Sequence, residues 1–397
     1  MSDPLTITLR PRRQESLPDR HPWVLENSIL PPRPAPADGD VVDLVTADGK
    51  WVARGIYNGQ SRIRLRLYSW DRGQPLDRDF WRDRLASAVE LRRILGYIDP
   101  AGACRLVFSE ADGLSGLIVD RYGEHLVVQT TALAMAHRIV EIGDLLGELL
   151  SPRGITVRTD RKIAAMEGME TQEAVLRGEP LPPSVTLREN GLSFQVDLGA
   201  GQKTGYYLDQ RENRLAAAAC LAGRRVLDMF CYVGGFSLAA ARLGGAREVL
   251  AFDSSQRAVE QARTNAALNG IQNVRFEVAE AFETLESLAS SGERFGAVIL
   301  DPPRFAGTRQ SIDHALRAYH RLNRLGVQIL EPGGVLVTCS CSGRVSRDDF
   351  SRMLYGVVRR TRREIQILQQ RGPSPDHPVR PSCPETDYLK CFICRVE

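Results

Sequence analysis

The sequence has 397 residues, of which 43% are apolar and 25% are charged, and its net charge is +3. This composition is ordinary for folded proteins, and the length predicts two or three domains with separate cores. The small net charge gives no overall electrostatic argument for nucleic-acid binding. No apolar run is long enough to cross a membrane, and the N-terminal residues lack the apolar segment of a secretory signal. We therefore expect a cytoplasmic protein without membrane attachment, in which the eight cysteines stay reduced.

The first predicted domain, residues 1–75, is rich in β-strands. Residues 40–58 contain two strand-like runs joined at Asp48-Gly49, which is a hairpin signal. Residues 61–70 alternate in polarity, so three arginines are expected on one face: Arg62, Arg64 and Arg66. Such a row is usually a solvated outer face, and the alternative is a face that contacts RNA phosphates. Arginine suits phosphate, although a skewed genomic base composition would produce the same excess of arginine over lysine.

The second predicted domain, residues 76–185, is a small α+β domain. Residues 79–95 form a helix candidate with one apolar stripe. Short strands follow, and then a helix over 133–150 and a strand at 154–160. The proline-rich residues 179–184 are interpreted as a linker into the rest of the chain.

The third predicted domain, residues 186–397, repeats strand and helix. Its strands are almost continuous apolar runs and its connections are long enough for helices, so we expect a doubly wound parallel α/β sheet. Ligands of such sheets bind outside the carboxyl ends of the strands. The apolar runs end at polar or reactive residues, which should therefore meet in one crevice: Asp228, Asp253, Asp301 and the pair Cys339 and Cys341.

A glycine loop and two acids indicate a nucleotide-like ligand. "VLDMFCYVGGFS" (226–237) predicts a strand, a short loop and a helix start, which would bring backbone N–H groups to a ligand. Its spacing does not match G-x-G-x-x-G, which counts against an ordinary nicotinamide site. Asp253 ends the next strand, where an acid accepts hydrogen bonds from ribose; it also fits a helix N-cap. Glu280 follows the third strand, within reach of an adenine amino group, although alone it would be a surface acid.

"DPPRF" (301–305) is a more specific signal. Two prolines directly after a strand remove two N–H donors and fix φ, so the chain must leave the sheet at once and Asp301 is held in a stiff frame. A structural turn is the competing interpretation. An acid followed by two prolines at this place is typical of methyltransferases that use S-adenosylmethionine.

The two cysteines of "VLVTCSCSG" (335–343) allow four interpretations. A zinc site would also need Cys391 and Cys394, but residues three apart in a strand point to opposite faces, so no metal is expected. A disulfide between Cys339 and Cys341 would distort the strand. Cys339 is then expected to pack in the core. Cys341, which follows the last apolar residue of the strand, is the candidate nucleophile.

Six motifs together resemble one family. "KTGYYLDQRENR" (203–214), "FCYVGGF", "LDPPRF", "SCSG", "DHPV" (376–379) and "YLK" (388–390) are similar, in order and spacing, to the bacterial ribosomal RNA large-subunit methyltransferase I family. The resemblance covers essentially the whole chain. It implies a PUA-like RNA-binding domain, a small α+β domain and a class I (Rossmann-like) methyltransferase domain. It also implies S-adenosyl-L-methionine as cofactor, 23S ribosomal RNA as partner and 5-methylcytosine as product.

The same resemblance assigns roles to residues. The family's nucleophile maps onto Cys341. Apart from the resemblance, we expect Asp301 to hydrogen-bond the cytosine edge, and Arg304 or Arg344, which are near in sequence, to lower the pKa of the thiol. The residues implied or expected to line the cofactor pocket are Gln210, Asp228, Phe230, Tyr232, Gly234, Asp253, Glu280 and Asp301. Cys231 and Val233 stand where the family often has serine and threonine.

Three alternatives stay open from the residues alone. The nearest is a methyltransferase of the same fold that acts on an exocyclic amine or another RNA position and needs no thiol. A nucleotide-binding oxidoreductase and a non-catalytic RNA-binding protein are the others. The sequence does not identify the modified cytosine or the base that removes its carbon 5 proton. It also does not distinguish a monomer from a homodimer.

Overall fold

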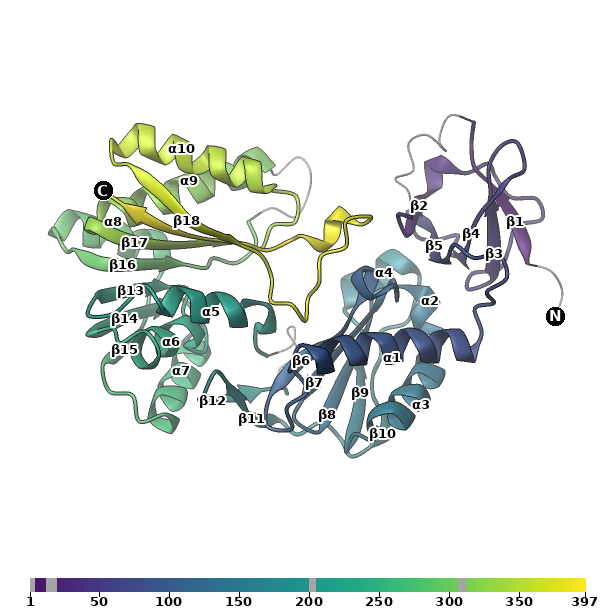
Figure 1. Ribbon diagram of the computed structural model, residues 1–397, viewed down its shortest axis with the longest axis horizontal. Coiled ribbons are helices and arrows are strands. Elements are labelled where there is room, and N and C mark those ends of the chain that lie inside the picture. The colour runs from purple at the N-terminus through teal and green to yellow at the C-terminus, as the bar shows by residue number, and fades with distance from the viewer. Residues whose placement is uncertain (1–3, 12–19, 200–204, 306–311) are drawn as a thin grey trace. The chain divides into compact units, whose positions relative to one another are not determined.

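The structure is a computed structural model that describes residues 4–11, 20–199, 205–305 and 312–397 (Figure 1). The chain divides into two compact units. The first consists of Met1–Pro183, Leu198–Thr204 and Pro375–Thr386, and the second of Ser184–Asp197, Gly205–Ser374 and Asp387–Glu397. Each unit therefore takes segments from distant parts of the sequence, whereas the three predicted domains were contiguous.

The first unit begins with a five-stranded sheet in the order β1-β3-β4-β5-β2. Its strands are β1 (Leu5–Thr8), β2 (Trp23–Leu25), β3 (Val41–Val45), β4 (Trp51–Tyr57) and β5 (Ile63–Ser69). β3 and β4 pair antiparallel, and Gly49 in their connection has φ +83°, a conformation that favours glycine. The predicted hairpin is therefore confirmed.

The second sheet of this unit has the order β10-β9-β8-β7-β6. The strands are β6 (Ala103–Phe108), β7 (Leu117–Tyr122), β8 (His125–Thr130), β9 (Gly154–Arg158) and β10 (Glu173–Gly178). The helices are α1 (Arg78–Ile94), α2 (Leu133–Ala136), α3 (Ile139–Leu150) and α4 (Arg161–Glu167). Asp77 caps α1, because its side chain accepts a hydrogen bond from the Phe80 amide. The helix predicted over 133–150 is two helices.

The second unit contains a hairpin, β11 (Ser184–Glu189) and β12 (Leu192–Asp197), and a seven-stranded sheet in the order β15-β14-β13-β16-β17-β19-β18. The strands of the sheet are β13 (Arg225–Met229), β14 (Glu248–Asp253), β15 (Val274–Val278), β16 (Phe295–Leu300), β17 (Leu330–Ser340), β18 (Ile365–Arg371) and β19 (Lys390–Val396). All six residues of β16 are buried, as expected for a strand covered on both faces.

Helices cover both faces of this sheet (Figure 1). They are α5 (Arg211–Ala218), α6 (Gly235–Arg242) and α7 (Gln256–Leu268) on one face, and α8 (Ala281–Ser291), α9 (Ile312–Gln328) and α10 (Arg347–Thr361) on the other. The expectation of a wholly parallel sheet is wrong at one edge, where β19 pairs antiparallel with both β17 and β18. Between β18 and β19 the described residues contain one short 3-10 helix (Pro384–Thr386) and no α-helix of the kind that usually connects parallel strands.

The strand order reverses between β14 and β16, which flank β13 on its two sides. Such a switch point opens a crevice at the carboxyl ends of the strands. Among the helices of the described ranges, none combines the length and the apolar character that a membrane crossing requires.

Candidate active site

The carboxyl ends of the central strands bring three acids together. Asp228 is the fourth residue of β13, Asp253 is the last residue of β14, and Asp301 directly follows β16. The charges of Asp301 and Asp253 both act on Asp228. The predicted convergence of these side chains at one edge of the sheet is therefore what the structure shows.

Asp228 has an unusual environment for a carboxylate. It is buried, and one oxygen accepts a hydrogen bond from the Ser237 hydroxyl, whereas the other oxygen, Oδ1, has no hydrogen-bond partner among the described residues. Burial raises the pKa of Asp228 to about 7, and the neighbouring carboxylates add to this effect. An unsatisfied buried acceptor at a switch point is suited to a ligand that brings a hydrogen-bond donor.

The glycine loop after β13 is strained. Phe230 has φ +73°, Tyr232 has φ +50° and Gly234 has φ +89°. Residues other than glycine rarely adopt this region, and such conformations cluster at binding sites. At Gly235, an added Cβ would lie 2.6 Å from Nε of Arg214, so the close approach of that guanidinium requires glycine.

Asp253 fastens this loop to β14. Its Oδ2 accepts the Tyr232 amide at 2.9 Å and its Oδ1 accepts the Ser255 amide at 2.9 Å. The N-cap of α7 is Ser255, whose hydroxyl accepts the Ala258 amide, so the interpretation of Asp253 as a helix cap is wrong. Each carboxylate oxygen keeps a second lone pair that a ribose hydroxyl could use.

Gln210 and Asp301 act as a pair. Gln210 is buried, its Nε2 donates to Oδ1 of Asp301 at 3.0 Å, and its Oε1 accepts from Asn213 at 2.7 Å. Gln210 therefore orients Asp301. Burial raises the pKa of Asp301 to about 7, with a further contribution from the negative charge of Asp209. Asp301 is consequently a mixture of the acid and the carboxylate at neutral pH.

The remaining predicted cofactor residues lie around this loop. The Phe230 ring packs against the core of the sheet, and the Tyr232 hydroxyl donates to the Gly205 carbonyl at 2.9 Å. Glu280 is exposed at the N-cap position of α8, and its side chain makes no capping hydrogen bond.

Cys339 in β17 and Cys341 just after it differ in burial, as expected. Cys339 is fully buried and opposite Cys391 on β19, and burial raises the pKa of Cys339 well above its usual value. Cys341 follows the strand and is half-buried, and its Sγ lies 3.9 Å from the carbonyl oxygen of Pro302, the residue after Asp301. Cys339 therefore packs in the core as expected, whereas Cys341 lies beside the segment that follows Asp301.

Sequence reasoning missed two polar residues at this edge. Asp209 receives a hydrogen bond from the Tyr388 hydroxyl, and its Oδ1 is buried without a partner in the described chain. Lys390 is buried and donates to the Ser342 carbonyl. Both residues stand inside motifs that the sequence had marked, "YYLDQR" and "YLK". The signal was therefore present, but nothing local assigned these residues to the crevice.

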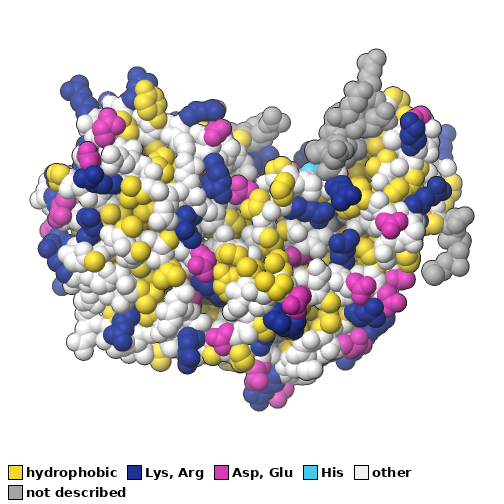
Figure 2. All heavy atoms as spheres, viewed as in Figure 1, with side chains coloured by type: hydrophobic (Ala, Val, Ile, Leu, Met, Phe, Trp, Pro, Cys, Tyr) yellow, Lys and Arg dark blue, Asp and Glu magenta, His cyan; other side chains and the backbone are white. Residues whose placement is uncertain are grey.

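The three predicted arginines, Arg62 just before β5 and Arg64 and Arg66 on it, do not share one environment. Arg62 is exposed, and Arg64 donates to Glu26 at 3.2 Å. Arg66 is 7% exposed and is ion-paired with Glu110 at 3.2 Å and Glu167 at 3.1 Å. The expectation that Arg66 contacts RNA is therefore wrong, because the buried Glu167 and the partly buried Glu110 already use its guanidinium. On the face shown in Figure 2, basic side chains are interspersed with acidic and apolar ones.

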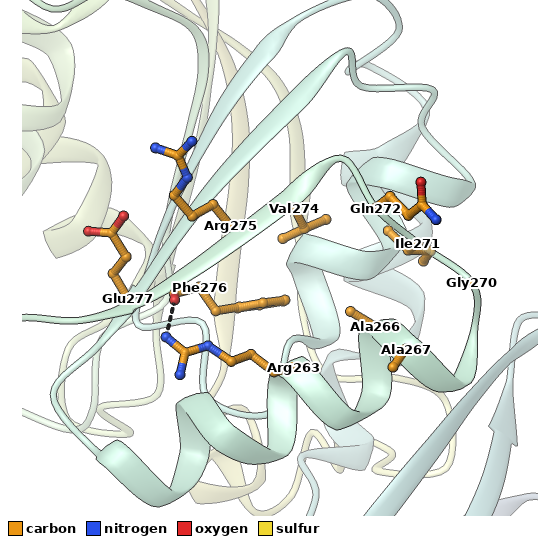
Figure 3. Close-up of a pocket in the computed structure, with 10 residues that line it drawn as sticks. All are labelled: Arg263, Ala266, Ala267, Gly270, Ile271, Gln272, Val274, Arg275, Phe276 and Glu277. Atoms are coloured by element: carbon orange, nitrogen blue, oxygen red, sulfur yellow. Dashed lines mark hydrogen bonds between the residues drawn. The ribbon is translucent and has the colours of Figure 1, made fainter.

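A separate pocket of about 670 Å³ lies between α7 and the edge strand β15 (Figure 3). Arg263 on α7 donates to the Phe276 carbonyl across it at 2.6 Å. None of the residues that line this pocket belongs to the predicted site. Its position on the sheet edge sets it apart from the acids and the thiol.

One cluster in the first unit has the ligand types of a metal site. Side-chain atoms of His21, Cys383 and Glu385 lie within 4.8 Å of one another. The His21 Nδ1 accepts the Trp23 amide at 3.1 Å, so the proton of the neutral ring is on Nε2, which faces Glu385 at 3.1 Å. A metal would need the Nε2 lone pair, so the cluster is better explained as a hydrogen-bonded contact.

Comparison with known proteins agrees with the predicted fold and the predicted cofactor. A family model described as S-adenosylmethionine-dependent methyltransferase matches residues 166–378, and a PUA-like domain model matches residues 7–70. The fold is similar to that of SMU.776, solved in complex with SAH, with a TM-score of 0.85 and 21% identity over 99% of this chain and 100% of that chain. The protein is therefore a class I methyltransferase that uses S-adenosylmethionine and carries a PUA-like domain.

Curated relatives narrow the family. The Erwinia tasmaniensis protein is 37% identical and covers 98% of this chain and 99% of its own length. The Aeromonas hydrophila protein is 39% identical, with the same coverage. The Photobacterium profundum protein is 38% identical over 99% of both chains. All three are named ribosomal RNA large subunit methyltransferase I, and the chain belongs to this family.

Proposed function

We propose that this protein methylates carbon 5 of a cytosine in 23S ribosomal RNA through a covalent adduct with Cys341. The relatives' names support the large-subunit RNA as substrate class. The observation that carries the covalent step is the half-buried Cys341 at the edge where Asp301 lies, beside a fully buried second cysteine. A methyltransferase for an exocyclic amine would need the acid and its prolines but no thiol at the crevice.

The thiol solves a problem of reactivity. Carbon 5 of cytosine is a poor nucleophile, and attack of the Cys341 thiolate on carbon 6 forms an S–C6 bond and moves the electron pair of the C5–C6 double bond towards carbon 5. S-adenosylmethionine, when bound, supplies the electrophilic methyl group. Loss of the carbon 5 proton then re-forms the double bond, breaks the S–C6 bond and releases the thiolate.

Asp301 is suited to the ring edge of the cytosine. Negative charge builds up on the ring when the thiolate adds, and a hydrogen bond from the protonated carboxyl would stabilise it. A pKa of about 7 keeps part of Asp301 protonated at neutral pH. Gln210 holds the carboxyl in one orientation through the 3.0 Å bond.

The cofactor would use the strained loop and the acids around it. The unpaired Oδ1 of Asp228 and the remaining lone pairs of Asp253 are acceptors for the polar groups of S-adenosylmethionine. In this proposal the backbone conformations of Phe230, Tyr232 and Gly234 shape the loop. Glu280 is exposed two residues after the end of β15.

The RNA has to present an unstacked cytosine, because a base stacked inside a helix cannot be reached by a thiol of the protein. The PUA-like domain would contact the phosphate backbone and position the RNA. Of the three arginines, Arg62 before β5 and Arg64 on it stay in this proposal.

Alanine substitution of each cysteine tests the covalent step. Cys341→Ala should reduce methyl transfer to 23S RNA below detection, whereas the matched control Cys339→Ala should keep most of it. The readout is 5-methylcytosine in digested RNA by mass spectrometry. Binding of SAH by calorimetry should be unchanged in both variants, which shows that the fold is intact. Full activity in Cys341→Ala, or loss only in Cys339→Ala, would reject the proposed nucleophile.

A further inference from the structure

Lys390 is a buried amine beside the loop that carries Cys341. It is the first residue of β19, is opposite Ser340 in the register of the sheet and is 1% exposed. Its Nζ donates to the Ser342 carbonyl at 2.7 Å and to the Tyr388 carbonyl at 2.9 Å. These two acceptors use two of the three N–H bonds of an ammonium group.

The charge of Lys390 has no dedicated counter-ion. Among the ion pairs of the described residues none includes Lys390, and Asp387, the carboxylate with the largest effect on it, is held by Arg347 at 2.8 Å and 3.1 Å. A buried cation without a paired anion is costly. The charge of a Cys341 thiolate interacts with Lys390 and stabilises its protonated form.

A thiolate at Cys341 would be stabilised by a nearby buried positive charge. Among the other described groups around it, the phenols and the acid are not cations, and the arginines are exposed or ion-paired. Tyr207 and Tyr319 face it, from the segment before α5 and from α9, and Asp301 precedes Pro302 at the same edge. Two arginines also act on Lys390, but Arg304 is exposed and Arg347 is paired with Asp387. Arg344, the other expected activator, is exposed as well.

We infer that Lys390 is the positioning residue that ionises Cys341: its ammonium stabilises the thiolate, and its bond to the Ser342 carbonyl fixes the loop that carries the sulfur. This inference deepens the proposed function and rests on it. Burial lowers the pKa of Lys390 to about 8, so most of the amine is still protonated at pH 7. A cation of this kind is what lowers the ionisation range of reactive thiols in proteins.

The reactivity of the thiol tests this role without RNA or cofactor. The rate of Cys341 alkylation by iodoacetamide is measured against pH on the full-length protein, with the modified site identified by fragmentation mass spectrometry in a Cys339→Ala background. Cys220, the other half-exposed cysteine of the described residues, is an internal reference in the same molecule. In the protein with Lys390 intact, Cys341 should reach half of its maximal rate at a lower pH than Cys220.

Two substitutions separate charge from hydrogen bonding. Lys390→Gln keeps N–H donors for the two carbonyls but removes the charge, and should move the Cys341 midpoint up by about one pH unit, which is about a ten-fold slower reaction at pH 7. Lys390→Arg keeps the charge and should leave the midpoint within a few tenths of a unit. Lys162→Met, at an exposed lysine of α4, is the control that should change nothing.

Several results would overturn the inference. One is a Cys341 midpoint no lower than that of Cys220 in the protein with Lys390; this comparison needs no substitution at Lys390. Another is an unchanged midpoint in Lys390→Gln with unchanged Cys220 reactivity. If either result occurs and the RNA adduct still forms normally, the role of Lys390 is rejected and the covalent mechanism stands. If the midpoint shifts in Lys390→Gln but no RNA adduct forms with the unsubstituted protein, the role of Lys390 stands and the covalent mechanism is rejected.

Discussion

Asp228, which we propose as a cofactor ligand, lowers the stability of the ligand-free protein at neutral pH. Its folded pKa is about 7, well above the value of about 4 in an unfolded chain. Between these values the folded protein binds more protons than the unfolded one, so the free energy of unfolding falls as pH rises from about 4 to about 7. A ligand that donates a hydrogen bond to Oδ1 would offset this loss.

Asp228→Asn should therefore stabilise the ligand-free protein at pH 8 and weaken SAH binding at least ten-fold. The amide cannot ionise, so the stabilisation should shrink as pH falls towards 4. Calorimetric melting at several pH values measures the first effect, and titration with SAH measures the second. Ser237→Ala, which keeps the carboxyl and removes its partner, is the matched control and should not gain stability. An Asp228→Asn protein that melts no higher at pH 8 would contradict this account.

The positions of individual candidate residues in the fold could be predicted where a strand ends near them. Asp228, Asp253, Asp301 and Cys341 were located because apolar runs ended at them. Lys390 is the first residue of a strand, so a rule based on the carboxyl ends of strands did not identify it as a site residue. The positive φ of Phe230 and Tyr232 also has no signal in the residue types, because neither is glycine or asparagine.

At the scale of elements, β5 shows why alternation alone does not define a solvated face. The alternation correctly placed Leu65 in the core, but the opposite face is not solvent along its whole length. Glu167 at the end of α4 and Glu110 cover Arg66, and Ser115 accepts a further hydrogen bond from it at 3.1 Å. Packing between sequence-distant elements decides exposure, and a period of two residues carries no information about it.

The different environments of Arg62 and Arg66 predict different phenotypes. Arg62→Ala should lower the slope of log affinity against log salt by about one, because one exposed charge is lost from the RNA interface. Arg66→Ala should instead cost about 3 to 5 kcal/mol of stability, since the buried Glu167 and the partly buried Glu110 lose their partner. Filter binding at several salt concentrations and thermal melting measure these effects. An unchanged slope in Arg62→Ala would show that Arg62 is an ordinary surface residue that does not contact the RNA.

The sheet of the second unit also shows that local sequence patterns predict some structural features and not others. Strand and helix patterns gave its five parallel strands, because continuous apolar runs and helical connections are local features. The antiparallel edge depends on how β18 and β19 are connected, which a local pattern does not contain. The fold class was therefore predictable and the strand direction at the edge was not.

At the scale of the whole molecule, a late segment of the chain completes the first unit. Residues 375–386 carry the "DHPV" motif, and the Asp376 carbonyl accepts a hydrogen bond from Arg92 at 2.7 Å. Arg92 is fully buried and also ion-paired with Asp112 at 2.7 Å, and the Asp376 carboxylate accepts the Arg105 amide at 3.0 Å. Such a contact between residues 284 apart leaves no trace in local sequence, although the motif itself was noticed.

The charge of the whole molecule agrees with a role for local contacts in RNA binding. A net charge of +3 gives little long-range attraction, and the face in Figure 2 shows no single basic region. In this account the RNA is held by particular side chains of the PUA-like domain, and the reaction is decided at the crevice of the second unit.

The most direct measurement of the central claim is covalent trapping with RNA that contains 5-fluorocytosine. Fluorine at carbon 5 cannot leave as a proton does, so the S–C6 bond should persist after methyl transfer. Incubation with S-adenosylmethionine should give a denaturation-stable complex, with the RNA attached at Cys341 by fragmentation mass spectrometry. Cys339→Ala should still form it and Cys341→Ala should not. Methylation of normal RNA without any trapped complex, or attachment at another residue, would contradict the proposed chemistry.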